Sequence, residues 1–233
     1  MATYPVTKTF STTFTATANP TITLSNAPAG GIVVCVNGNT QYTCPHSISD
    51  DAGNTYTVVL QDYNTTGISM TMYVCKNFAG GSPTISPVMQ SSTNGEIIVL
   101  CVYGLNQSTV ANSGMLDPNV IGGALSGSTT AIYVNQYGVC SPFTYPGDLV
   151  VCMSANGTNG KATLSKWDGI SVGQLSVLYH MSSAPGETLP AFTTIGSQDL
   201  GVCYSAVVSF QRNTNVIRKP SLKPHPFSPG IAR

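Results

Sequence analysis

The residues best arranged for catalysis lie in the pentapeptide 169–173 (GISVG), which matches the GxSxG pattern of a nucleophilic serine. Asp199 and His225 follow Ser171 in the order Ser, Asp, His that α/β-hydrolases use. Such a serine needs a strand before it and a helix after it, but the residues after the pentapeptide have the composition of a strand. His225 also falls in a proline-rich segment. The pentapeptide is therefore interpreted as a loop, no catalytic residue is assigned, and the chain is expected not to be an enzyme.

Oxygen-bearing side chains gather in the segment 50–54 (DDAGN), where Asp50, Asp51 and Asn54 are candidate ligands for a calcium ion. The spacing is not that of an EF-hand, and Asx residues followed by glycine also form tight turns. A turn is the favoured interpretation. The three histidines lack the spacing with cysteines or carboxylates that a zinc site requires, so no metal or other cofactor is expected.

The single tryptophan, Trp167, stands directly before Asp168. An aromatic ring can stack on a sugar while a neighbouring carboxylate accepts its hydroxyl hydrogens, so Trp167 and Asp168 are candidate glycan-binding residues. The alternative is that the ring belongs to the core or to a subunit interface.

The elements that position these residues are short runs of β-branched and aromatic residues, separated by Gly, Asn, Ser and Pro clusters. No segment combines a 3.6-residue apolar period with helix caps. The pattern predicts an all-β protein: a single antiparallel β-sandwich of jelly-roll type. The chain is expected to comprise an N-terminal strand or arm (1–19), the sandwich (20–211) and a basic, proline-rich tail (212–233). The expected strands are 7–17, 31–36, 55–60, 68–75, 84–89, 96–103, 131–135, 148–154, 161–167, 174–181 and 202–211.

Charged residues are scarce and unevenly distributed. They make up 8% of the chain, against about 25% in an ordinary soluble domain. Residues 1–211 hold four basic and all nine acidic residues, whereas 212–233 hold five basic residues and no acid. A polar but nearly uncharged surface gives little protection against self-association. Five positive charges among four prolines are too few to favour nucleic acid as a partner.

Seven cysteines include no CxxC pair, and several lie inside apolar runs as small buried hydrophobes would. A bridge between Cys35 and Cys44 is the less favoured alternative. The first residues contain no apolar segment typical of a secretory signal, and no apolar run is long enough to cross a membrane. Synthesis in a reducing cytoplasm is therefore expected.

Several segments together resemble a β-sandwich module found in phage virion proteins and bacterial surface proteins. They are GGIVVCV, DDAGNTY with its D-x-x-G-N-x-Y spacing, ISMTMYVCKNFAGGS, IIVLCVYGLN, YPGDLVVCM and VCYSAVVSFQ, within residues 20–211. The resemblance implies the sandwich fold and is poorly specific for function. The acidic residue that usually precedes the "GL" of the middle strand is absent, since Cys101-Val102-Tyr103 stands there.

These observations lead to the expectation of a non-enzymatic structural protein of a phage-like virion, such as a capsid decoration, fibre or tail component. Its expected partners are identical subunits and other virion proteins. In the tail, Phe227 is expected to anchor on a neighbouring subunit, with Arg218, Lys219 and Arg233 at the rim of the contact. A glycan-binding attachment module is the alternative function.

Overall fold

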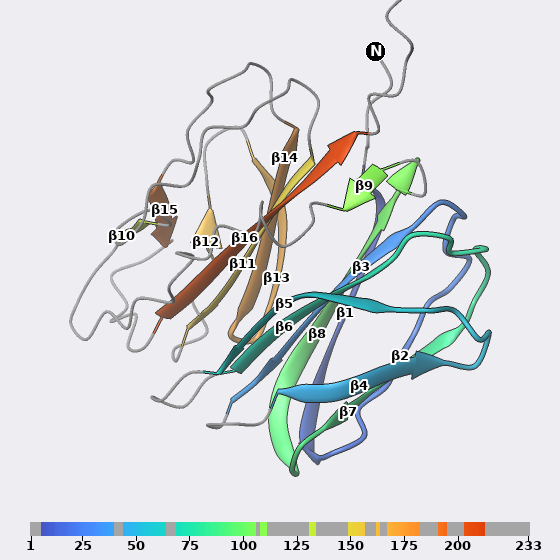
Figure 1. Cartoon of the computed structure of the whole chain (residues 1–233). Coiled ribbons are helices and arrows are strands. Elements are labelled where there is room, and N and C mark those ends of the chain that lie inside the picture. The colour runs from blue at the N-terminus through green and yellow to red at the C-terminus, as the bar shows by residue number, and fades with distance from the viewer. Residues whose placement is uncertain are drawn as a thin grey trace, which may run out of the picture.

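The regular structure in the described part of the chain is β-strand, apart from a 3-10 turn at Leu105. The computed structural model describes residues 6–39, 44–63, 69–105, 108–110, 131–133, 149–156, 162–163, 167–181, 191–194 and 203–212, and these ranges contain no α-helix. Every strand pairing in them is antiparallel, so the all-β expectation is confirmed (Figure 1). Each of the expected strand segments overlaps an observed strand.

The strands of the first half are β1 (Val6–Thr17), β2 (Ile22–Thr23), β3 (Ile32–Gly38), β4 (Pro45–Asp50), β5 (Thr57–Tyr63), β6 (Ser69–Cys75), β7 (Thr84–Met89) and β8 (Thr93–Val102). Those of the second half are β9 (Ser108–Val110), β10 (Ala131–Tyr133), β11 (Leu149–Asn156), β12 (Ala162–Thr163), β13 (Asp168–Val172), β14 (Leu175–Met181), β15 (Ala191–Thr194) and β16 (Cys203–Arg212).

The two halves have the same strand order. In the first half, sheet A runs β1-β8-β3-β6-β5 and sheet B runs β2-β7-β4. In the second half, sheet C runs β9-β16-β11-β14-β13 and sheet D runs β10-β15-β12. Adding eight to each strand number of the first half reproduces the second half without exception. No strand of one half pairs with a described strand of the other, so the described chain contains two topologically equivalent units, where the sequence suggests a single sandwich.

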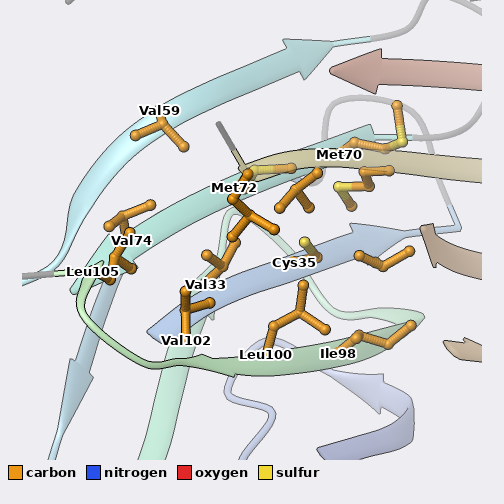
Figure 2. Close-up of a cluster of buried hydrophobic side chains, with 14 of the residues drawn as sticks. Val33, Cys35, Val59, Met70, Met72, Val74, Ile98, Leu100, Val102 and Leu105 are labelled. Atoms are coloured by element: carbon orange, nitrogen blue, oxygen red, sulfur yellow. The ribbon is translucent and has the colours of Figure 1, made fainter. Parts of the chain in front are cut away.

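Sheet A is covered on both faces. One face packs on sheet B around side chains such as Val34, Tyr73 and Val99, and the other packs on sheet C around side chains such as Cys35, Leu100 and Val151. The second cluster is called here the shared core, because both halves contribute to it; Figure 2 shows its side chains on β3, β5, β6 and β8. Two covered faces explain why β3 and β6 are buried along their whole length and lack the apolar–polar alternation of a half-exposed strand.

One contact between the halves is repeated by the same relation. Strand β8 packs against β13, and β16 packs against β5. Adding eight to the first-half member and subtracting eight from the second-half member converts one contact into the other. Among the described residues, the contacts of β1 with β13 and of β8 with β14 have no equally extensive counterpart in β9 with β5 and β16 with β6, so the two-fold relation between the halves is approximate.

Candidate functional site

Trp167 lies immediately before β13 and stacks on His180 of β14. The ring centroids are 5.2 Å apart and the ring planes are inclined by 24°. Both side chains are partly exposed. Each ring covers one face of the other, so the pair can offer a ligand only its outer ring faces and edges, at one end of the β13–β14 hairpin; a sugar ring can stack on such an outer face.

Asp168 lies directly opposite Tyr179 in the β13–β14 pairing, and Tyr179 packs against the shared core. Burial, and the Asp168 carboxylate beside it, raise the pKa of the Tyr179 hydroxyl. Neighbouring residues of an extended chain point to opposite sides, so the Asp168 side chain is directed away from the Trp167–His180 pair. The structure thus gives Trp167 an aromatic partner that the sequence does not suggest, while it does not bring Asp168 to the same surface.

The segment at Asp50 is a hydrogen-bonded turn between β4 and β5. One carboxylate oxygen of Asp50 accepts from the backbone N–H groups of Ala52 (3.1 Å) and Asn54 (2.9 Å). The other accepts from the Asn54 amide (2.6 Å) and the Tyr56 hydroxyl (2.7 Å). Gly53 adopts a positive φ of 74° that suits glycine. The D-x-x-G-N-x-Y spacing is therefore explained residue by residue by the geometry of this turn.

The charge state of Asp50 follows from the same contacts. Partial burial alone would raise the pKa of its carboxyl, but the hydrogen bonds from Asn54, Tyr56 and Ala52 outweigh it and hold the pKa below its usual value. Asp51 uses one oxygen to accept from the Thr84 backbone N–H at 2.9 Å, which ties the turn to β7. Both acidic residues thus serve the turn. Within the described ranges, no three His, Cys, Asp or Glu side chains come together as a metal site would require.

Ser171 is part of a hairpin and not of a strand–helix elbow. Its hydroxyl lies 2.8 Å from the hydroxyl of Ser176 on the adjacent strand. Gly173 has φ 52° and forms the hairpin turn with Gln174, whereas Gly169 lies within β13 opposite Leu178, so only the second glycine of the pattern serves the β13–β14 connection. This segment is strand where the sequence suggests a loop. The other two members of the pattern, Asp199 and His225, lie outside the described residues.

Cys35, Cys44, Cys75 and Cys101 are buried free thiols. Burial raises the pKa of the Cys35 thiol strongly; it also raises the pKa of the Cys101 thiol to about 11, against the opposing effect of the nearby Lys8 charge. The Cys44 thiol donates to the Met70 backbone oxygen at 3.7 Å. The alternative of a Cys35–Cys44 bridge is therefore wrong, and these thiols behave as core residues.

Glu96 is a functional candidate that inspection of the sequence misses. It lies on β8 with only 5% of its surface exposed. Its Oε1 accepts from the Gln174 backbone N–H (3.2 Å) in the β13–β14 turn, and its own N–H donates to the Asn37 side-chain oxygen (2.9 Å). Oε2 has no hydrogen-bond partner among the described residues. A buried carboxylate thus links sheet A to the hairpin of the second half; its only sequence signal is one acid at the start of an apolar run.

The expected subunit-contact residues Arg218, Lys219, Phe227 and Arg233 lie outside the described residues. The described part of the chain contains no helix long and apolar enough to cross a membrane. No protein-family model, curated protein or solved structure matches the chain.

Proposed function

We propose that this chain is a non-enzymatic structural protein of a phage-like virion, a capsid decoration, fibre or tail component that self-associates, and that each half is a jelly roll. In a jelly roll, an antiparallel ribbon of eight strands folds over so that the first strand pairs with the eighth, the second with the seventh and the third with the sixth. The pairings β1–β8, β2–β7 and β3–β6, repeated as β9–β16, β10–β15 and β11–β14, support this topology. The fifth strand departs from it, because it pairs with the sixth and not with the fourth.

The observation that carries the structural role is the combination of this doubled strand order with a nearly uncharged sequence. Jelly rolls are common in capsid proteins and in lectins, so the fold alone does not select a function. Few charges favour stable contact with other protein surfaces, because little electrostatic repulsion or hydration of ions opposes association. The buried acidic and thiol side chains described above act within the core and in turns, as a scaffold requires.

The proposal predicts that the purified chain forms oligomers without any added ligand. It also predicts that the chain co-purifies with particles released by cells that carry its gene. Sedimentation velocity over a concentration series measures the first, and immunogold electron microscopy of density-purified particles measures the second. A chain that stays monomeric throughout the series and is absent from such particles would overturn the proposal.

The Trp167–His180 stack supports a second candidate, a glycan-binding attachment module. A glycan array with the full chain tests it, and Trp167→Ala should abolish any signal. The matched control is Tyr103→Ala, because Tyr103 is a well exposed aromatic residue on the first half. Equal glycan signals from both variants would remove the stack as the binding surface.

A further inference from the structure

Strand β1 is the longest strand of the first half and forms an edge of sheet A. It pairs with β8 on one side, and no described strand pairs with its other side. Breaks in register between Val6 and Lys8 and between Phe14 and Thr17 bound a regular stretch of seven residues, 8–14. An open strand edge presents unpaired N–H and C=O groups and is a template for another strand.

The hydrogen bonds of the neighbouring ladder show which residues of β1 present these groups. In the β3–β8 ladder, the N–H of Val102 bonds the oxygen of its direct partner Gly31, and the N–H of Asn39 bonds the oxygen of Asn94. Antiparallel strands alternate hydrogen-bonded and non-bonded pairs. The even-numbered residues of β8 therefore direct their backbone N–H and C=O groups toward β3, and the odd-numbered residues direct theirs toward β1.

Three β1 residues lie opposite odd-numbered β8 residues: Lys8 pairs with Cys101, Phe10 with Val99 and Thr12 with Ile97. The backbone N–H and C=O groups of these β1 residues therefore hydrogen-bond to β8. The residues between them, Thr9, Ser11 and Thr13, direct their backbone N–H and C=O groups outward from the sheet.

The usual protections of an edge are few in this stretch. It contains no proline, and its only charge is Lys8, at one end. The Lys8 ammonium donates to the backbone oxygens of Ser25 and Asn26 and lies 5.0 Å from the Phe10 ring centre, so it is held against its own half. Natural edge strands use lysines and prolines to prevent pairing with another strand. In β1 the bulges at the two ends of the stretch are the main features that limit such pairing.

We propose that β1 pairs with β1 of a second copy of this chain, antiparallel and centred on Ser11, so that two five-stranded sheets become one of ten strands. The inference rests on the self-association in the proposed function and assigns its surface. The outward set is self-complementary, because Thr9 of each copy would face Thr13 of the other and Ser11 would face itself. No like charges would face each other, since Lys8 would lie opposite Phe14. A two-fold contact of this kind is the commonest symmetry of homo-oligomers.

A cysteine at the proposed centre tests the register in the full chain. Residues in a hydrogen-bonded antiparallel pair have Cα atoms about 5.5 Å apart, which is within the range that a disulfide spans. Ser11→Cys should therefore form a disulfide-linked dimer under mild oxidation, seen on a non-reducing gel. Thr15→Cys is the matched control. Thr15 is also exposed, but in the proposed register the Thr15 residues of the two chains would be about 27 Å apart along the strand. Equal dimer yields from the two variants, or none from Ser11→Cys, would overturn the register.

A second pair of variants measures the contribution of the edge without a covalent bond. Ser11→Lys places two ammonium groups opposite each other at the centre, and we expect it to weaken dimerisation at least about tenfold in sedimentation equilibrium. Thr15→Lys should change it less than about twofold, and both variants should keep the melting temperature of the wild type at low concentration.

The outcomes separate the inference from the proposed function. A wild type that oligomerises, with Ser11→Lys equal to Thr15→Lys, overturns the edge assignment and leaves self-association standing. A monomeric wild type overturns both. A Ser11→Cys chain that is cross-linked to a different particle protein, and not to itself, overturns the choice of a second copy as the occupant of this edge.

Discussion

The contact between Glu96 and the turn at Gly173 allows a quantitative test of how the two halves are joined. A Cβ built on Gly173 would overlap Oε1 of Glu96 and lie 2.8 Å from its Cδ, and the residue has φ 52°. Gly53 is a matched control, because its φ is 74° in an exposed turn and its added Cβ meets nothing within 4 Å. Alanine at the two positions therefore differs mainly in the encounter with the buried carboxylate.

The expected magnitudes follow from these geometries. A left-handed conformation costs an alanine about 1–2 kcal/mol, and the lower entropy of its unfolded chain offsets about 0.4–1 kcal/mol. Gly53→Ala should therefore lower the free energy of unfolding by about 1 kcal/mol. Gly173→Ala adds overpacking of about 1–3 kcal/mol and should cost about 2–4 kcal/mol in total.

Removing the carboxylate should remove the difference. Glu96→Ala leaves the Gln174 N–H without its acceptor and should itself cost about 1–3 kcal/mol. In that background, Gly173→Ala should cost only about 1 kcal/mol, so the double-mutant cycle should give a coupling of about 1–3 kcal/mol. Urea unfolding of the four proteins, followed by tryptophan fluorescence of Trp167, measures the cycle. A coupling below about 0.5 kcal/mol would show that Glu96 and the turn do not meet as described.

Three further predictions concern the turn, the thiols and the tail. Because the pKa of Asp50 is lowered in the folded chain, its contribution to stability is present above the unfolded pKa of about 3.9 and is lost as the pH falls. The difference in unfolding free energy between wild type and Asp50→Asn should therefore narrow from pH 7 to about pH 3; a constant gap would contradict it. Thiol titration should find all seven cysteines after denaturation without reductant, but the four described thiols should react slowly in the native chain; rapid native labelling of Cys35 would refute this. Deleting residues 213–233 should leave the melting temperature nearly unchanged and weaken self-association, whereas undiminished assembly would remove the tail as a contact.

The sequence predicts the all-β class because β-branched runs and turn residues are strong local signals. It misses β2, β4, β9, β13 and β15, which are short or rich in polar residues and glycine. These strands gain their stability from pairing with distant partners, which local composition does not report.

The doubled strand order is also invisible in the sequence. Residues 33–35 of β3 and 150–152 of β11 both read VVC, but the middle valines face different cores: Val34 packs toward sheet B, whereas Val151 packs in the shared core. An offset of one residue turns a strand over, so matching letters here do not mark matching positions.

Among the candidate sites too, features made by neighbouring residues are predictable from the sequence, and features that join distant strands are not. The turn at Asp50 and the positive φ of Gly53 are predictable, because the residues that make the turn lie within seven positions of one another. The Trp167–His180 stack and the Glu96–Gln174 hydrogen bond are not, because each depends on strands that only the fold brings together.

The nested pairing has a consequence for the order of folding during synthesis. Val6 pairs with Val102, so sheet A cannot close until the ribosome has released almost the whole first half. The face carrying Cys35, Leu100 and Val102 then has no cover until β11 and β14 have formed. A nascent chain that has completed only its first half therefore exposes an apolar surface, which is the condition under which chains aggregate or recruit chaperones. A truncated chain ending at residue 105 should therefore aggregate or bind chaperones more than the full-length chain does.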